Sequence, residues 1–310
     1  MSQPKKNMDR TASSLMIIMC MIWAIQQSVI KMIALDMAPT LQIGLRSIIG
    51  VICIAWVMKR RNISFALHKG PWKAGLIVGA MFALEFLFIG ESLARTSASH
   101  LVIFLYTAPI FTALGLHWKL PLERLSSRQW SGILLSFVGI FIAFLGGFLT
   151  PDLDWRTILG DIYALLAGLV WGLTTVVLRC SDLNRIHPTQ TTQYQLIMAF
   201  IILCLAAIVT GQTDVNWTPL VISAVIGQGI LISFVSLLIW FWLLTVYNVS
   251  QLAAFSFLTP IFGVAFGVIL LDEPLSLNFI LGAMLVILGV AIVNHPSSAS
   301  RPSKHLKQGS

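Results

Sequence analysis

Long apolar stretches separated by short polar segments fill the sequence from residue 13 to residue 294. A helix that crosses a lipid bilayer needs about 20 mostly apolar residues, and only a helix or a closed barrel satisfies its own backbone hydrogen bonds in hydrocarbon. Ten stretches qualify as helices. We predict spanning helices at residues 13–35, 40–58, 72–93, 97–118, 129–148, 158–178, 189–209, 219–245, 249–271 and 276–294.

The composition supports an all-α integral membrane protein. Hydrophobic residues make up 57% of the 310 positions and charged residues 10%, whereas a soluble domain carries about 25% charged residues. The longest interruption, residues 59–71, is too short for an extramembrane domain. Residues 1–12 are predicted to be a cytoplasmic segment, and residues 295–310, rich in serine, proline and lysine, a disordered cytoplasmic tail.

The basic residues fall mainly on one side of this arrangement. Cytoplasmic loops of membrane proteins are enriched in lysine and arginine. With the N-terminus inside, 16 of the 20 lysines and arginines lie in cytoplasmic segments, and Lys31, Arg95 and Arg156 lie towards the other side. We therefore predict a multi-pass protein of the cell inner membrane with both termini in the cytoplasm.

The second half of the chain repeats the first. The segment TAPIFTALG around Pro109 is similar to LTPIFGVAFG around Pro260, and Glu-Arg-Leu-Ser at 123–126 matches Glu-Pro-Leu-Ser at 273–276, 150 residues later. Five spans per half is an odd number, so the second half must be inverted relative to the first. Inverted repeats are typical of secondary transporters, whose substrate site lies near the midplane between the repeats.

The two halves resemble paired EamA domains of the drug/metabolite transporter superfamily. The resemblance is carried by ARTSASHLVIFLYTAPIFTALG in the first half, residues 13–148, and by YNVSQLAAFSFLTPIFGVAFGVILLDEPLSLNFILGAMLVILGVAIVN in the second, residues 158–294. It implies ten transmembrane helices in two inverted five-helix repeats. It also implies a central cavity formed by the first four helices of each half, and export of amino acids, nucleosides or other small metabolites.

Two matched prolines stand near the middle of the fourth and ninth predicted helices. Pro109 and Pro260 each lack a backbone donor, which frees the carbonyl four residues earlier, at Leu105 and Ser256. The kinks either act as hinges and offer backbone acceptors to a substrate, or only shape the packing of the helices.

Ionisable residues of the predicted helices that lie in the outer half of the membrane include Arg46, Glu85, Glu91 and His100. A charge at the bilayer centre costs at least about 2.5–3.5 kcal/mol, so such residues need a partner or a function. Arg46 either pairs with Glu85 or Glu91, or attracts a substrate carboxylate. Glu85, Glu91 and His100 are candidates for proton coupling. The repeat partner of Arg46 is the neutral Gln195, so an anion site would be asymmetric.

The first and sixth helices each carry a tryptophan followed, one turn later, by two polar residues. The candidate substrate-binding residues are Trp23, Gln26, Gln27, Arg46, Glu85, Tyr106, Trp171, Thr174, Thr175 and Ser256, with Gln228, Ser233, Ser236, Trp240 and Gln251 as weaker candidates. An aromatic wall with a few polar groups suits small metabolites, although polar side chains in membranes also join helices to one another.

Glycines recur every seven residues in the fifth and tenth helices, at Gly132, Gly139 and Gly146 and at Gly282 and Gly289. Small residues on one stripe allow helices to approach closely. We predict that these stripes are packing seams, either within the bundle or in a homodimer.

The sequence lacks a phosphate-binding GxxxxGK[ST] loop, a HExxH helix and a GxSxG elbow, so no enzyme, cofactor or nucleic-acid partner is predicted. The leading hypothesis is a transporter that works by alternating access, with lipid and a small-molecule substrate as its partners. An intramembrane enzyme and a non-transporting scaffold are the alternatives of another class. Arg46 and the tryptophans favour amino acids, and nucleosides, purines and other amphipathic metabolites stay open.

Overall fold

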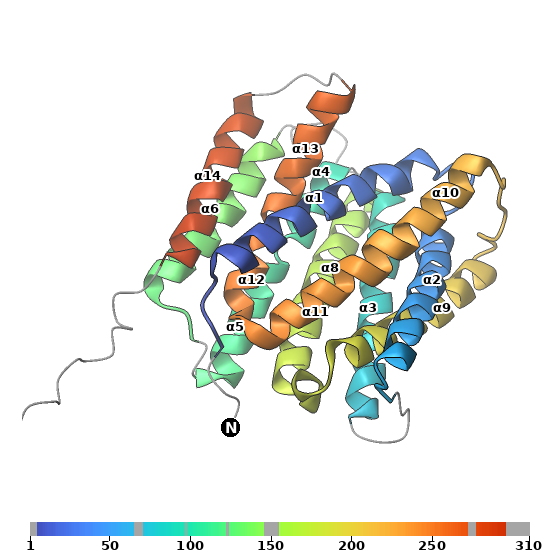
Figure 1. The fold of residues 1–310 in the computed structure, drawn as a ribbon. Coiled ribbons are helices and arrows are strands. Elements are labelled where there is room, and N and C mark those ends of the chain that lie inside the picture. The colour runs from blue at the N-terminus through green and yellow to red at the C-terminus, as the bar shows by residue number, and fades with distance from the viewer. Residues whose placement is uncertain are drawn as a thin grey trace, which may run out of the picture.

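The computed structural model describes residues 5–64, 71–96, 98–121, 124–145, 155–271 and 277–295, which form a helical bundle (Figure 1). The helices of the first half are α1 (Arg10–Met32), α2 (Pro39–Arg60), α3 (Trp72–Leu93), α4 (Ala98–Leu105), α5 (Ala108–Lys119) and α6 (Ser127–Ala143). Those of the second half are α8 (Trp155–Cys180), the 3-10 helix η2 (Asp182–Arg185), α9 (Pro188–Val209), α10 (Pro219–Gln228), the π-helix η3 (Gly229–Ser236), α11 (Leu237–Val246), α12 (Val249–Phe255), α13 (Leu258–Leu271) and α14 (Leu277–Asn294).

Every stretch predicted from hydropathy contains helix. Within the described residues, seven helical segments are long and apolar enough to cross a membrane. Shorter apolar helices at Arg10–Gln26, Ser127–Ala143 and Val249–Gly263 occupy the other three predicted stretches. The chain is therefore an all-helical membrane protein.

Local sequence sets where several helices begin. Proline occupies one of the first two positions of α2, α5, α9 and α10, where its missing N–H would have no partner in any case. The side chains of Thr218 and Asn248 accept hydrogen bonds from amides three residues later, each at 3.2 Å. Ser126 and Gln129 form a capping box at the start of α6.

The glycine stripes of α6 and α14 pack against each other inside the molecule, and the two helices lie side by side in Figure 1. A Cβ atom on Gly139 would lie 2.6 Å from the carbonyl oxygen of Gly282, and one on Gly132 would lie 2.7 Å from that of Gly289. At these positions only glycine allows the two backbones to approach so closely. The predicted seam thus lies within the bundle, and the predicted homodimer would have to use other faces of these helices.

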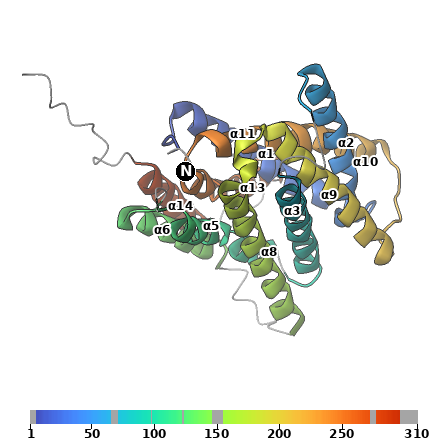
Figure 2. The same cartoon turned by 90° about the horizontal axis from the view of Figure 1, so that it is seen from below.

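Helices of the two halves also alternate in the rest of the bundle. Helix α2 packs against α9, and α3 packs against both α8 and α9, as the view from below shows (Figure 2). Glycine again brings backbones close, because a Cβ on Gly79 would lie 2.7 Å from the carbonyl oxygen of Tyr194. Neither half therefore encloses the middle of the bundle alone.

Both matched prolines follow a break in their helix. Helix α4 ends at Leu105 and α5 begins at Ala108, one residue before Pro109. Helix α12 ends at Phe255 and α13 begins at Leu258, two residues before Pro260. The expected kinks are present, and their role as hinges stays a prediction.

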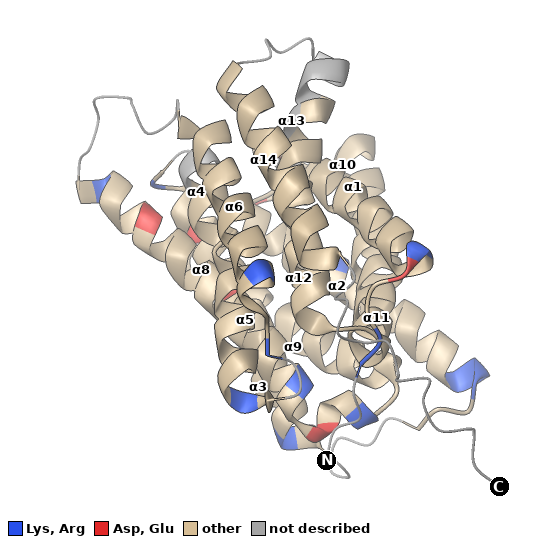
Figure 3. Cartoon of the chain, turned by 90° about the vertical axis from the view of Figure 1, so that its left-hand side faces the viewer, with Lys and Arg blue, Asp and Glu red and all other residues tan. Residues whose placement is uncertain are grey.

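Apolar and charged side chains are separated on the surface. Large apolar side chains such as Ile52, Leu205, Ile208 and Met284 are exposed on the outer faces of helices, which is the pattern expected of a lipid-facing surface. Most lysines and arginines gather towards the end of the molecule at which the N-terminus lies (Figure 3).

Candidate functional site

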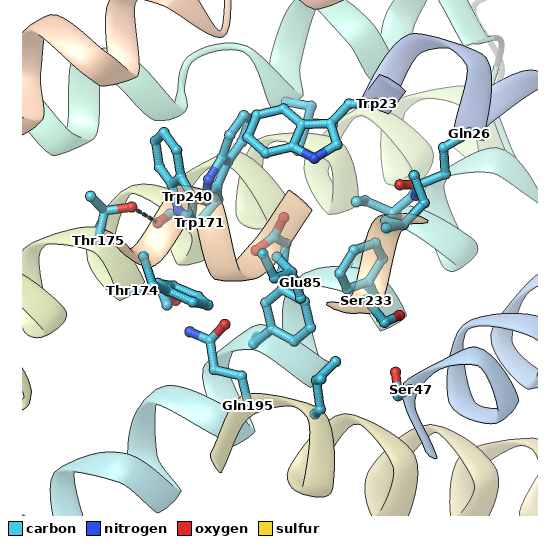
Figure 4. Close-up of a pocket in the computed structure, with 18 of the residues that line it drawn as sticks. Trp23, Gln26, Ser47, Glu85, Trp171, Thr174, Thr175, Gln195, Ser233 and Trp240 are labelled. Atoms are coloured by element: carbon cyan, nitrogen blue, oxygen red, sulfur yellow. Dashed lines mark hydrogen bonds between the residues drawn. The ribbon is translucent and has the colours of Figure 1, made fainter. Parts of the chain in front are cut away.

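A cavity of about 120 Å³ lies in the middle of the bundle and is lined by both halves of the chain (Figure 4). The first half contributes Trp23, Gln26, Arg46, Ser47, Phe82, Glu85, Phe86, Ile89, Leu105 and Tyr106, and the second contributes Trp171, Thr174, Thr175, Leu178, Gln195, Leu196, Ile232, Ser233, Leu237, Trp240, Phe241 and Thr259. Aromatic side chains surrounding a few polar groups are typical of sites for small molecules.

Two edge-to-face aromatic pairs form part of the wall. The ring centroids of Trp23 and Trp240 lie 5.6 Å apart at 74°, and those of Tyr106 and Trp171 lie 5.7 Å apart at 83°. The indole Nε1 of Trp23 donates a hydrogen bond of 3.1 Å to the hydroxyl of Ser236. Each pair joins a residue of one half to a residue of the other, so the wall is assembled only in the folded chain.

Arg46 is 3% exposed and is held by neutral amides. Its Nη1 donates a 3.1 Å hydrogen bond to the side-chain oxygen of Gln228. In the amide orientation that satisfies both side chains, the oxygen of Gln26 accepts from Nη1 at 2.8 Å and from Nη2 at 3.2 Å. The guanidinium carbon also lies 5.4 Å from the ring centroid of Phe86. The positive charge of Arg46 therefore has polar contacts but no carboxylate partner among the described residues.

Glu85 is the acidic residue of the cavity. Its side chain is 8% exposed and points into the cavity (Figure 4). The ion pairs and hydrogen bonds found among the described residues leave its carboxylate without a partner, and Glu91 pairs with Arg95 instead. The pairing of Arg46 with either glutamate is thus not formed in this structure.

Polar groups from the second half complete the lining. The hydroxyl group of Thr174 donates to the backbone carbonyl of Val170 at 2.7 Å. That of Thr175 donates to the carbonyl of Trp171 at 3.2 Å, the dashed line in Figure 4. Their oxygens consequently have lone pairs free to accept a hydrogen bond. The side-chain oxygen of Gln195 is buried without a partner among the described residues and lies at the cavity.

A π-helix forms part of the cavity wall. The eight residues of η3 bring Ile232 and Ser233 to the cavity, and Ser236 at its end accepts the hydrogen bond from Trp23. Segments of π-helix are rare and are frequent at functional sites. Hydrophobic periodicity predicts a regular helix here, so no sequence pattern indicated this feature.

Eight of the ten predicted substrate-binding residues line the cavity, and their role in binding stays a prediction. Ser256 lies outside the lining, and its hydroxyl donates to the carbonyl of Ala253 at 2.6 Å. The side chains of Gln27 and His100 lie outside the described set, and Glu91 does not line the cavity. Pro109 and Pro260 are buried beside it, near the lining residues Leu105 and Thr259.

The cavity is also lined by residues that are not among the predicted ones, including Ser47, Phe82, Phe86 and Thr259. Isolated serines, threonines and phenylalanines are common in membrane helices, so residue type alone gives no signal. Gln195 could have been predicted as a cavity residue from one feature of the sequence, its position as the repeat partner of Arg46.

The two ends of the bundle are held by polar contacts. At one end the hydroxyl of Thr96 donates to Asp161 at 2.8 Å, which joins the turn after α3 to α8. At the other end residues 5–9, here called the N-terminal strap, pair with the turn after α11. Lys6 donates from its backbone N–H to Val246 at 3.1 Å and accepts from Asn248 at 2.8 Å.

Further contacts join the strap to residues that line a second, smaller cavity. Nζ of Lys5 donates to the side chain of Asn184, at 3.1 Å, and to the carbonyl of Thr245. Asn184 and Thr245 line a cavity of about 20 Å³ that shares Thr175 with the central one. The strap thus contacts two residues of the smaller cavity, at the end of the bundle where the basic residues gather.

This architecture, an apolar exterior around a central cavity that is partly polar, defines a multi-pass membrane protein. The family model for the EamA-like transporter family matches residues 10–145 and 158–295, and the chain belongs to this family, as its sequence resemblance indicated. The family and its relatives identify a membrane transporter.

Relatives of the chain agree with this assignment. The chain is 23% identical over 273 residues to the uncharacterized transporter YoaV of Bacillus subtilis, covering 87% of this chain and 92% of the relative. It is 28% identical over 240 residues to an uncharacterized transporter of Archaeoglobus fulgidus, covering 76% and 81%. A solved crystal structure shares the fold with a TM-score of 0.79 at 18% identity, covering 92% of this chain and 98% of the other.

Proposed function

We propose that the protein is a secondary transporter with ten spanning helices in two inverted halves, which exposes the central cavity alternately to each side of the membrane. The pattern of helix contacts supports this. Helices α2 and α9, which correspond in the repeat, pack against each other, as do α6 and α14. Helix α1 packs against α13 in the way that its counterpart α8 packs against α5. Such exchange of equivalent contacts is expected of two halves related by a two-fold axis.

The substrates proposed for this cavity are amino acids, and the state of Arg46 is the observation that carries the proposal. A buried guanidinium bonded only to neutral amides retains its full charge, which attracts an anion. The aromatic walls give an apolar side chain a surface on which to pack. A small molecule with one carboxylate and one apolar group fits both features.

Nucleosides and purines are the second candidate class. The side-chain oxygen of Gln195 and the hydroxyl oxygens of Thr174 and Thr175 are acceptors at the cavity, and they face an aromatic wall. A base could stack on these rings and donate its N–H groups to the acceptors. Nucleosides and purines carry no carboxylate that would bind the charge of Arg46, so amino acids are the preferred class.

The proposed location is the cell inner membrane, with export towards the outside and both termini in the cytoplasm. The gathering of basic residues at the end of the molecule where the N-terminus lies favours this orientation. The strap then lies on the cytoplasmic side.

Uptake by proteoliposomes tests the function. Purified protein should accumulate or exchange labelled amino acids in preference to labelled nucleosides and purines. Arg46→Gln should lower the affinity for those amino acids about 10- to 100-fold, because one charged hydrogen bond is lost, and should spare the corresponding amines. Arg185→Gln is the matched control, since this arginine is exposed on η2 beside Asp182.

Two results would contradict the proposal. Wild-type vesicles that exchange nucleosides but no amino acid would favour the second class. Equal affinity for amino acids in the wild-type protein and in Arg46→Gln would remove the carboxylate site.

A further inference from the structure

Binding of a substrate carboxylate at Arg46 leaves one buried ionisable residue of the cavity, Glu85, without a role. It lies on α3, is more than nine-tenths buried, and points into the same cavity as Arg46. The hydrogen bonds and ion pairs found among the described residues give its carboxylate no partner. Burying an ionised carboxylate without a partner is costly, so a ligand or a proton has to satisfy it.

Arg46 and Glu85 have opposite charges in one cavity and do not form an ion pair. The hydrogen bonds from Arg46 to Gln26 and Gln228 hold its guanidinium in place without neutralising it. A purely anionic ligand at Arg46 would be repelled by Glu85, and a purely cationic ligand at Glu85 would be repelled by Arg46. A dipolar ligand satisfies both groups and enters the bundle with no net charge.

The surroundings of Glu85 also suit an ammonium group. Tyr106, Trp171 and the Trp23–Trp240 pair line the same cavity, and their ring faces attract cations. The hydroxyl oxygens of Thr174 and Thr175 are acceptors there as well. Acceptors and aromatic rings thus line the same cavity as the acidic group, while the guanidinium of Arg46 is the donor at the carboxylate site.

We propose that Glu85 is the ammonium subsite of the transporter and that the substrate is a zwitterion, with its carboxylate at Arg46 and its α-ammonium at Glu85. This inference rests on the proposed amino-acid function and makes it narrower. The site selects free amino acids and rejects both the decarboxylated amines and the deaminated acids that share their side chains.

The test measures binding by titration calorimetry in nanodiscs with three probes that share one side chain: phenylalanine, phenethylamine and 3-phenylpropionate. Wild-type protein should bind phenylalanine at least about 10-fold more tightly than either analogue. Glu85→Gln should weaken phenylalanine about 10- to 100-fold and leave 3-phenylpropionate unchanged or tighter. Arg46→Gln should do the converse, weakening phenylalanine and sparing phenethylamine.

Two further variants complete the design. Glu85→Asp keeps the charge, so it should bind phenylalanine more tightly than Glu85→Gln does. If Glu85→Gln does not fold, Glu85→Asp is measured in its place. Asp182→Asn removes an exposed acidic group on η2 and should bind all three probes as the wild-type protein does. Size-exclusion chromatography and thermal melting establish that each variant is folded.

Specific outcomes would overturn the inference. If Glu85→Gln weakens all three probes equally, or none, Glu85 is not an ammonium subsite. If the only change is that uptake no longer depends on an imposed pH gradient, Glu85 carries a coupling proton instead. In both cases the proposed function still holds if phenylalanine binds through Arg46. Failure of the wild-type protein to bind any amino acid would instead contradict the proposed function itself.

Discussion

At the scale of residues, the neutral partners of Arg46 decide whether its charge is available to a ligand. Nη1 lies 3.1 Å from the side-chain oxygen of Gln228, so Gln228→Glu would place a carboxylate against the guanidinium. We expect this variant to melt at the same or a higher temperature and to bind phenylalanine about 10- to 100-fold more weakly, because an internal carboxylate replaces that of the substrate. Calorimetry and thermal melting measure the two effects.

The exposed Gln212 gives the control for this change, since Gln212→Glu adds the same charge outside the cavity. Unchanged affinity in folded Gln228→Glu would mean that the charge of Arg46 takes no part in binding.

At the scale of elements, the contact between α6 and α14 depends on missing side chains. A Cβ on Gly139 would lie 2.6 Å from the carbonyl oxygen of Gly282, which is backbone and cannot rotate away. Gly139→Leu should therefore force the helices apart and destabilise the protein by about 1–3 kcal/mol or more, as overpacking does. The melting temperature in nanodiscs should fall.

The neighbouring Val138 faces outward from the same helix and is exposed, so Val138→Leu is the matched control and should melt as the wild-type protein does. Equal melting of all three proteins would show that the two helices do not need this close contact.

At the scale of the whole molecule, the N-terminal strap joins the start of the chain to the turn after α11, and Asp9 helps to hold it there. The Asp9 carboxylate accepts hydrogen bonds from the backbone N–H of Ala12, at 2.8 Å, and from the hydroxyl of Tyr247, at 2.8 Å, and these bonds lower its pKa. A pKa lowered by folding means that the contact stabilises the strap fully at pH values above the ordinary pKa of aspartate. The stabilisation is lost as the pH falls through the lowered value.

Asp9→Asn should reproduce this loss at neutral pH. Hydrogen–deuterium exchange should become faster at the amides of Lys6 and Asn248, which pair the strap with the turn after α11. Exchange of the α6 peptides provides the internal control. Identical protection of the strap in Asp9→Asn and wild-type protein would show that the backbone pairing holds it without Asp9.

Features that depend on local composition and on the repeat could be predicted from the order of residues alone. The length and apolarity of each stretch predicted its helix, since a stretch of about 20 apolar residues satisfies its own backbone hydrogen bonds in lipid only as a helix. The repeat indicated which tryptophans and polar residues to consider, and Trp23, Arg46 and Trp171 do line one cavity. The hydrogen-bond partners of the cavity residues, in contrast, depend on how the helices pack. The partner of Arg46 could have been either glutamate or an amide, because hydropathy contains no information on distances between helices.

The π-helix that brings Ser233 to the cavity is likewise a tertiary outcome. An extra residue in a helical turn does not alter an almost uniformly apolar pattern, so nothing in the sequence of η3 indicates it. The close packing of Gly50 in α2 against Ser233, where a Cβ would lie 2.7 Å from the serine Cβ, depends on a contact between distant helices. The positions of the helices along the chain therefore follow from local hydropathy, whereas the polar contacts in the cavity follow from the packing of helices that are distant in sequence.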